Sequence, residues 1–528
     1  MKVLSRERVA PGSFEAWMVL AGFLVIAASN LMLWPIDYPP LVDWANHLAR
    51  HALQCAEDPI SGLGRYYEYR FTWVPNLAAE LVHLLPVACR SVLVTQKVLI
   101  QFATTGLLAA TIVLHASVWR RWSVWPLLAT FGMFHMAFAY GFENYILALP
   151  PMLLALSLWF WRRDCDAVAR LMPMIPAVAV IYVLHLYAFV FLFCMIGLLE
   201  LQKWRRGGRN LRDFGRVFVL TCLIAAGPAA HLVSVMFVTA GVDASEIAFG
   251  SIQTKLGVVL SPFVSLGVAI LNDEVFLATW LQFLAVVGIV LICRFLKPPV
   301  VMLSEARLAV ILMVVVTLLM PTTLGAVHYT DIRFPVALLC VLIAISDIRL
   351  PRLGAAAFVI VIVGASLVRV SWLETSWARH NTEVRELLTL GDVLSGEHRI
   401  LVARTAEPIE VLLHSHSAAH VSRVTGAFIP DIFSGGNSLS ARPQFAVRDA
   451  FQSFPQPVSR LVEEANAPRP AIRGETPDGS LYWADWKKFY THVLVFSRSG
   501  ETVQDIPELG RVVRRGSFFA LFENKRTD

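Results

Sequence analysis

The chain consists largely of apolar runs of about 20 residues separated by short clusters of arginine, and about 20 apolar residues are what a helix needs to cross a bilayer. Its 528 residues are 56% hydrophobic and only 16% charged, with a mean hydropathy of +0.60. A soluble globular protein does not reach this balance. The sequence therefore predicts an α-helical polytopic membrane protein embedded in a lipid bilayer.

The first apolar run begins after a basic N-terminal segment. Lys2, Arg6 and Arg8 precede the stretch from Trp17 to Pro35, which is longer than the apolar region of a signal peptide. We expect a retained helix whose N-terminus is cytoplasmic. The formal net charge of +6 predicts no nucleic-acid partner, because basic residues of membrane proteins gather in cytoplasmic loops.

The basic clusters predict the topology. Five of them mark candidate cytoplasmic turns, at residues 119–122, 161–163, 203–216, 294–297 and 349–352. Each interval between two clusters must then contain an even number of crossings. The interval 171–201 is so short that it predicts two short helices with a turn near His185. The count is about eleven transmembrane helices, with the C-terminal part outside.

Further spans follow from the apolar pattern. They are 91–117, two helices within 124–160 with GFEN (141–144) at the outer tip, 217–240, 275–293, 308–324, 334–345 and 355–368, and the apolar stretch 256–271 could dip back into the membrane. We predict a transmembrane domain at 1–372, with a large first periplasmic loop at 37–92. The predicted periplasmic α/β domain at 373–528 has strand-like runs at 400–403, 492–496 and 518–522.

The seven cysteines indicate little about disulfides. None follows Cys340, so the polar C-terminal part has no disulfide framework. Cys55 and Cys89 could pair if their loop is extracytoplasmic. We expect them to remain unpaired.

Ionisable residues concentrate in the first outer loop, DYPPLVDWANHLAR. They are Asp37, Asp43, His47 and Arg50, and His51 follows the string directly. The spacing of Asp43, His47 and His51 places a carboxylate and two imidazoles on one helical face, where they could provide a general base or hold a divalent cation. A loop leaving the bilayer is also polar for ordinary reasons. Charged groups at a membrane boundary are costly unless they are used, which favours the functional interpretation.

This loop and four other strings resemble the GT-C superfamily of integral-membrane glycosyltransferases, and also uncharacterised bacterial multi-pass proteins grouped with it. The other strings are WVPNLAAELV (73–82), GFENYILALP (141–150), HLYAF (185–189) and DIRFP (331–335). The resemblance implies a protein of the bacterial inner membrane that transfers a sugar at the periplasmic face. The donor would be a polyprenyl-phosphate sugar, and the acceptor a glycan, a lipid or a protein.

The resemblance also implies roles for individual residues. Asp43 would be the base that deprotonates the acceptor hydroxyl, with Asp37 as the second choice. His47 would orient the acceptor or contact the departing phosphate. Arg333 would bind the lipid phosphate, with Arg50 as the alternative.

The predicted substrate-binding set is Arg50, His51, Glu143, Asn144, His185, Asp331 and Arg333. Several of these have an ordinary structural alternative. Arg333 could reach the membrane interface and pair with Asp331. Glu143 and Asn144 could be polar only because they lie at a loop tip, and His185 could join two helices by a hydrogen bond.

No metal ligands are assigned and no cofactor is certain, although a divalent cation at the first loop stays open. The string HSHSAAH contains His414, His416 and His420. No cysteine or close acidic residue accompanies them, so they predict a solvated loop instead of a metal site.

Two other classes of function remain as alternatives. A transporter or flippase of lipid-linked glycans predicts ionisable residues in the middle of several helices, whereas here they gather at one face, and no internal repeat is present. A non-catalytic scaffold for envelope polysaccharide assembly predicts that Asp43→Asn retains function. No Walker loop, dinucleotide fingerprint or HExxH motif is found, which argues against an ATP-driven pump, a dehydrogenase and a zinc protease.

Overall fold

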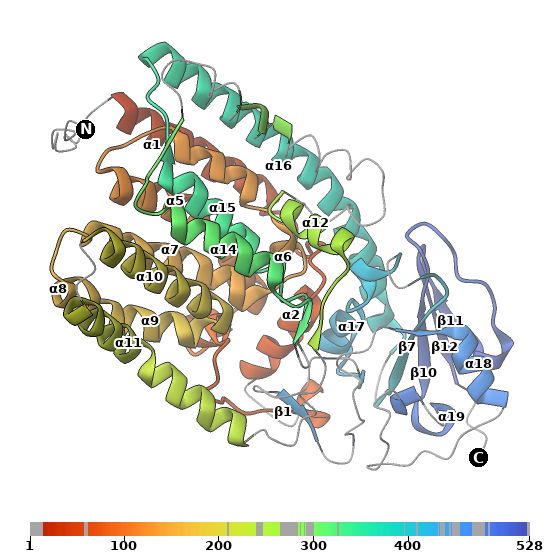
Figure 1. Cartoon of the computed structure of the whole chain (residues 1–528). Helices are drawn as coiled ribbons and strands as arrows, with labels where there is room; N and C mark the ends of the chain where they lie inside the picture. The colour runs from red at the N-terminus through yellow and green to blue at the C-terminus, as the bar shows by residue number, and fades with distance from the viewer. Residues whose placement is uncertain are drawn as a thin grey trace.

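The computed structural model combines a bundle of apolar helices with a C-terminal β-sheet (Figure 1). It describes residues 14–524 except 57–61, 208–210, 239–246, 264–283, 286, 290, 292–299, 325–326, 395–396, 408–409, 431, 433–438, 443–444, 446–454, 467–480 and 484–485. In Figure 1 the bundle lies to the left and the sheet to the right, and helix α16 runs along the bundle toward the sheet.

Seven helices in the described ranges are long and apolar enough to cross a membrane. These spans are Phe14–Leu33, Val92–Trp119, Glu143–Trp161, Ala167–Leu184, Leu186–Arg206, Phe214–Ser234 and Arg352–Asp392, and three shorter apolar segments are Trp125–Ala139, Arg307–Leu319 and Phe334–Ile345. The chain is therefore a multi-pass membrane protein. The total of eleven helices stays a prediction, since the predicted span 275–293 lies largely outside the described residues.

The elements of the bundle have the following bounds. They are α1 (Phe14–Asn30), α5 (Val92–Trp119), α7 (Glu143–Trp161), α8 (Ala167–Leu171), α9 (Met174–Leu184), α10 (Leu186–Arg206), α11 (Leu211–Val238), α14 (Arg307–Leu319), α15 (Phe334–Ile345) and α16 (Arg352–Leu388). Helix α5 packs along α7 and α15, and α1 packs along α16. The short pair with a turn at His185 is confirmed by α9 and α10.

The two helical segments predicted within 124–160 are present on either side of GFEN, but the first is not a continuous α-helix. The first half of the interval 124–160 forms a 3₁₀ helix, η3 (Trp125–Gly132), followed by the short α6 (Met136–Ala139). Pro126 stands in the first turn of η3, and the His135 side chain accepts a hydrogen bond from the Phe138 amide and so begins a separate helix. Apolar content alone does not distinguish these forms from a continuous α-helix.

Short elements of the first outer loop cover one end of the bundle. They are α2 (Trp44–Gln54), η2 (Gly62–Arg65), β1 (Tyr67–Tyr69), α3 (Ala78–Val82) and α4 (Pro86–Cys89). Helix α2 contacts both α5 and α17 (Ala418–Thr425), and β1 pairs antiparallel with β8 (Leu439–Ala441). The first loop and the C-terminal region are thus packed against each other.

The C-terminal region contains a five-stranded sheet in the order β11-β12-β10-β7-β9. The strands are β7 (Ile400–Arg404), β9 (Gln456–Pro457), β10 (His492–Phe496), β11 (Arg511–Arg515) and β12 (Phe519–Glu523), and helices α18 (Val458–Asn466) and α19 (Trp486–Phe489) accompany them. Strands β7 and β10 are parallel, and β10 and β12 are antiparallel. The three predicted strands are confirmed. Helix α16 continues without a break through residue 372, the predicted domain boundary.

The remaining described elements belong to the loops between bundle helices. They are α12 (Ile252–Leu260), β2 (Ile247–Ala248), β3 (Val301–Met302), β4 (Thr323–Leu324), β5 (Val327–His328) and β6 (Ser346–Asp347). The predicted re-entrant stretch 256–271 is described only through residue 263.

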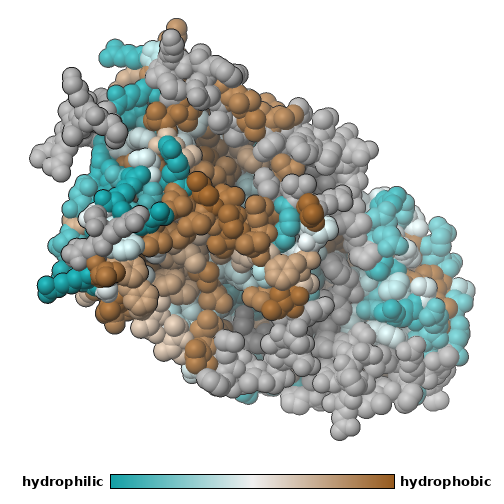
Figure 2. Space-filling view, in the orientation of Figure 1, coloured by the Kyte–Doolittle hydropathy of each residue, from teal (hydrophilic) through white to brown (hydrophobic). Residues whose placement is uncertain are grey.

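The surface changes character along the molecule. Figure 2 shows a brown, apolar band over the helices, with hydrophilic residues at the end near the N-terminus and over the C-terminal sheet. Exposed apolar side chains on α11 and α16, including Phe218, Leu223, Ile360 and Val368, belong to helices that span this band. An apolar surface of this kind is stable against lipid and not against water.

The expectation for the loop cysteines is wrong. Cys55, at the end of α2, and Cys89, at the end of α4, form a disulfide with their Cα atoms 5.2 Å apart. They are separated by 34 residues in sequence. Their proximity comes from the way α2 and α4 fold onto the bundle, which spacing alone does not reveal.

We expect the Cys55→Ser, Cys89→Ser double variant to unfold at a lower temperature than the wild type. The free energy of unfolding should fall by about 3 to 4 kcal/mol, because the disulfide no longer restricts a 34-residue loop in the unfolded chain. Differential scanning fluorimetry of the protein in detergent measures it, and Cys165→Ser, at an exposed free cysteine, is the control. Maleimide labelling of Cys55 and Cys89 without prior reduction would contradict the disulfide.

Candidate functional site

The segment GFEN forms a sharp turn before α7, and this turn contacts the first loop at Asp43. Gly141 has φ +75°, and a Cβ at this position would lie 3.1 Å from the backbone nitrogen of Asp43. The Asp43 amide donates a hydrogen bond to the Tyr140 carbonyl at 3.1 Å. Only glycine permits both the left-handed turn and this close approach. Asp43 is thereby fixed beside the start of α7.

Glu143, in the first turn of α7, is the centre of a buried polar cluster. The residue is 6% exposed, and its Oε2 lies 3.2 Å from Nδ1 of His47 and 3.1 Å from Nε2 of His51. The N-terminal end of a helix also favours a negative charge. Glu143 is therefore buried, whereas its structural alternative supposed a solvent-exposed residue at a loop tip.

The partners of the two histidines indicate their proton positions. Nε2 of His47 donates to the Gly141 carbonyl at 3.0 Å, so Nδ1 accepts from Nη2 of Arg50 at 3.2 Å. Burial lowers the pKa of His47 to about 4, although Glu143 opposes this, and His47 is neutral at pH 7. His51 faces acceptors on both sides, Gln54 Oε1 at 3.2 Å and Glu143.

Two members of the predicted substrate-binding set serve mainly to join elements. Arg50 pairs with the buried Glu80 of α3 at 2.5 Å. Asn144 accepts from the Ala79 amide at 2.7 Å and donates to the Asn76 carbonyl at 2.7 Å. The first interaction joins α3 to α2, and the second attaches α3 to α7.

Asp43 lies at the N-cap of α2, but its side chain does not cap the helix. Its Oδ1 is 3.7 Å from Nε2 of His416. Burial raises the pKa of Asp43 to about 8, and the charges of Arg333 and Arg50 oppose the rise. The carboxyl group is thus balanced between its neutral and ionised forms near physiological pH.

Arg333 precedes α15 and is buried beneath aromatic rings. Its guanidinium carbon lies 4.1 Å from the centre of the Phe142 ring and 4.9 Å from that of Tyr187. Nη1 donates to the carbonyls of Tyr329 at 2.8 Å and His328 at 3.1 Å. Nε is buried without a hydrogen-bond partner among the described residues.

Asp331 does not neutralise Arg333. Its Oδ2 lies 2.7 Å from Nζ of Lys255 and accepts from the Thr322 hydroxyl at 3.1 Å. Pairing of Arg333 with Asp331, the structural alternative, is therefore not observed. Arg333 keeps a buried positive charge near Asp43.

His185 caps the start of α10, and no hydrogen bond from its side chain to another helix is seen among the described residues. It lies between α9 and α10, and its Nδ1 accepts from the Tyr187 amide at 3.1 Å. Its ring contacts that of Tyr145 edge-on, with the centroids 5.1 Å apart. This side chain begins α10 and packs beside the cluster.

Asp37 stands apart from the other predicted site residues. It pairs with Lys97 at 3.0 Å and with Arg385 at 2.8 Å. Burial would raise the pKa of Asp37, but the hydrogen bonds from Lys97 and Arg385 outweigh it and hold the pKa below its ordinary value. These contacts attach the first loop to α5 and α16.

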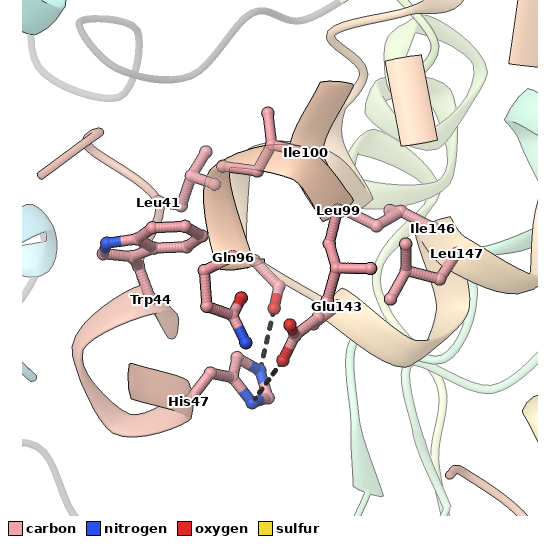
Figure 3. Close-up of a pocket in the computed structure, with 10 residues that line it drawn as sticks. Leu41, Trp44, His47, Gln96, Leu99, Ile100, Glu143, Ile146 and Leu147 are labelled. Carbon is pink, nitrogen blue, oxygen red and sulfur yellow. Dashed lines mark hydrogen bonds and ion pairs between the residues drawn. The ribbon is translucent and has the colours of Figure 1, made fainter. Parts of the chain in front are cut away.

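A cavity opens beside His47 and Glu143, between α2, α5 and α7. It is small, with room for about one water molecule, and is lined by Leu41, Trp44, His47, Gln96, Leu99, Ile100, Gly141, Glu143, Ile146 and Leu147. Figure 3 shows His47, Glu143 and Gln96 converging on one side, with apolar side chains around the rest.

Gln96 is a site residue that sequence reasoning missed. It is 0% exposed, and neither its Oε1 nor its Nε2 has a hydrogen-bond partner among the described residues. A buried amide without partners costs about 1–3 kcal/mol, so its presence suits a polar ligand. The available signal was a glutamine inside the predicted apolar span 91–117.

The string HSHSAAH is not a solvated loop, and that prediction is wrong. His414 is 3% exposed and His420 is 2% exposed. The segment packs between α2 and the extension of α16, where the tertiary fold supplies the acidic neighbours Asp43 and Glu383 that the local sequence lacks.

Two groups in the described part of the chain have the composition of a metal site. They are His47, His51 and Glu143, and His380, Glu383 and His414, each with donor atoms within 4.8 Å of one another. In the first group, the Arg50 guanidinium lies 3.2 Å from Nδ1 of His47. With Nε2 of His47 bonded to the Gly141 carbonyl, neither of its ring nitrogens is left for a cation.

No family model matches the chain, and no curated protein does either. Among solved structures, the chain is similar to ArnT from Cupriavidus metallidurans, crystallised with undecaprenyl phosphate. The identity is 10% and the TM-score 0.45, over 97% of this chain and 98% of that one. At this identity most aligned side chains differ, so the chemistry of the site must follow from its own residues.

We expect Gln96→Leu to raise the thermal unfolding midpoint of the ligand-free protein, because it removes an unsatisfied buried amide worth about 1 kcal/mol or more. Gln101→Leu on the same helix is the matched control. Gln101 donates to the Asn30 carbonyl at 3.0 Å, so its loss should lower the midpoint. A lower midpoint for Gln96→Leu would show that Gln96 stabilises the fold.

Proposed function

We propose that the protein is a membrane glycosyltransferase that transfers a sugar from a polyprenyl-phosphate donor to a glycan, lipid or protein acceptor. The observation that carries the proposal is an apolar cavity that ends in a buried polar cluster, next to Asp43 and Arg333. A lipid-linked phosphate sugar has the same division into a long apolar chain and a polar reacting end.

The walls of the cavity suit the lipid chain of the donor. Leu99 and Ile100 of α5 face Ile146 and Leu147 of α7, so an isoprenoid chain entering between these helices would bury apolar surface. Gln96 at the polar end can donate to a phosphate or a sugar hydroxyl.

Arg333 suits the phosphate. Its buried Nε–H is a donor without a partner among the described residues, and a charged hydrogen bond to a phosphate oxygen would satisfy it. Phe142 and Tyr187 hold the guanidinium in place by stacking. The charge would stabilise the phosphate as it departs.

Asp43 suits the base. In the reaction, the acceptor oxygen forms a bond to the anomeric carbon while the bond from that carbon to the phosphate oxygen breaks. The proton of the acceptor hydroxyl passes to the Asp43 carboxylate, and the lipid phosphate leaves as an anion. Neutral His47, with Nε2 committed to Gly141, would help to orient the reacting groups.

The first outer loop and the C-terminal region would face the periplasm of a bacterial inner membrane. The disulfide between Cys55 and Cys89 supports this orientation, because disulfides persist in oxidising compartments. The arginine clusters at the opposite end, such as 119–122 and 161–163, suit the cytoplasmic side.

We infer that no divalent cation assists at His47, His51 and Glu143. Arg50 already supplies the positive charge beside His47 at 3.2 Å.

We expect kcat/KM for sugar transfer to rise with pH and level off above about 8. Asp43 acts in its ionised form, and its raised pKa of about 8 makes that form the minority at pH 7, with about a tenfold loss for each unit below the pKa. The measurement is transfer from a labelled polyprenyl-phosphate sugar between about pH 5.5 and 9.5. This range extends roughly 2.5 units below and 1.5 units above the pKa of Asp43.

The variants Asp43→Asn and Asp37→Asn distinguish the proposed catalytic base from a carboxylate that only joins the first loop to the bundle. Asp43→Asn should lose transfer by about 100-fold or more, whereas Asp37→Asn should keep kcat and lose some thermal stability. Full activity of purified Asp43→Asn would refute the role of Asp43, as would unchanged cell-surface glycans in a complemented deletion strain.

We expect Arg333→Gln to weaken binding of a polyprenyl phosphate by roughly 10- to 100-fold, because a charged hydrogen bond to phosphate is lost. Fluorescence titration in detergent measures this affinity. Arg385→Gln, at a residue that pairs with Asp37, is the control and should bind normally. Equal affinities for wild type and Arg333→Gln would exclude Arg333 from the phosphate site.

A further inference from the structure

A second histidine and carboxylate cluster lies where α16 leaves the bundle and meets the C-terminal region. His380 and Glu383 are one turn apart on α16, and His414 comes from the short helix η5 (Leu412–His414). Oε2 of Glu383 is 3.3 Å from Nε2 of His414 and 3.9 Å from Nδ1 of His380. The two imidazole rings lie face to face, with centroids 5.0 Å apart.

Hydrogen bonding within the described part of the protein leaves a histidine nitrogen of this cluster unsatisfied. His380 is 6% exposed, and its Nδ1, which faces the carboxylate, is buried without a hydrogen-bond partner among the described residues. A buried ring nitrogen of this kind is costly unless something binds it. The other oxygen of Glu383 accepts from the Ser499 hydroxyl, which fixes the direction of the carboxylate.

The cluster near α7 has the same three residue types but a different electrostatic setting. There Arg50 lies 3.2 Å from a histidine nitrogen. Around Glu383, the interacting partners are His414, Ser499 and His380, none of which carries a permanent positive charge. A cation is therefore favoured at Glu383, whereas at Glu143 the hydrogen bond from Arg50 already occupies the His47 nitrogen that would bind it.

We propose that Nδ1 of His380, Oε2 of Glu383 and Nε2 of His414 bind a divalent transition metal, with zinc as the best match. Imidazole nitrogen and carboxylate oxygen are standard zinc ligands, and the edges of a tetrahedral shell with bonds of about 2.1 Å measure about 3.4 Å. The observed separations of 3.3 Å and 3.9 Å fit this shell after small side-chain movements. Water or an anion completes it.

The metal would connect the membrane helix to the site of transfer. It joins α16 to the HSHSAAH segment, and His416 of that segment contacts Asp43 at 3.7 Å. Binding at His414 thus fixes the position of His416 beside the proposed base. This consequence rests on the proposed function, whereas metal binding itself does not.

The test is metal binding by the full-length protein in detergent after removal of metals with a chelator. Titration with Zn²⁺ should give one tightly bound ion per chain and a higher thermal midpoint, because binding to the folded state stabilises it. Co²⁺ should give the visible absorption of a four-coordinate site. Wild-type protein that binds no Zn²⁺ with micromolar affinity would overturn the proposal without any variant.

Matched substitutions locate the ion. Glu383→Gln and His414→Gln should each weaken Zn²⁺ binding by more than about 100-fold, and Ser499→Ala by roughly tenfold, the range seen when an outer partner of a ligand is removed. Glu143→Gln and His51→Gln should leave the affinity unchanged. Loss of binding in this second pair instead would place the ion in the other cluster and refute the proposal.

Zinc affinity tests the proposed metal site, and transfer activity tests the proposed function. One tight ion that depends on Glu383, in a protein with no transferase activity, would refute only the proposed function. Active protein that binds no ion would refute only the metal site.

Discussion

The arrangement of the outer end of this protein depends on the burial of one carboxylate. Glu143 begins a transmembrane helix with its side chain enclosed, and a charge in that position is stable only with compensating partners. The start of α7 supplies part of the compensation, and the contact from His51 and the nearby charge of Arg50, both on α2, supply the rest. The first loop must therefore lie on the end of the bundle.

Placing α2 in this way sets the positions of the proposed reacting groups. Because Asp43 precedes α2 and bonds through its amide to Tyr140, it lies close to Arg333 yet makes no capping hydrogen bond. The same arrangement leaves an apolar cavity beside the polar cluster. A charged cluster that stabilises the fold and a small, largely apolar cavity beside it thus arise from one packing arrangement.

Sequence reasoning located most of this end and misjudged several details. GFEN, HLYAF and DIRFP do gather with the first loop, because the arginine clusters fix which turns share a side. Asp43, His47 and His51 were expected to act together on one helical face. Instead, the two histidines contact Glu143, and Asp43 contacts His416. Gln96 was overlooked because one polar residue hardly alters the apolarity of a span.

The sequence by itself determined a multi-pass membrane protein, most of its described spans and three of the five strands of its C-terminal sheet, because hydrophobicity and periodicity are local properties. Only the tertiary structure decided which distant groups meet. The Cys55–Cys89 disulfide, the pairing of Asp331 with Lys255 and the approach of His414 to Glu383 all join segments whose separation along the chain carries no signal. Burial of polar groups is likewise decided by the packing of neighbours, as the HSHSAAH segment shows.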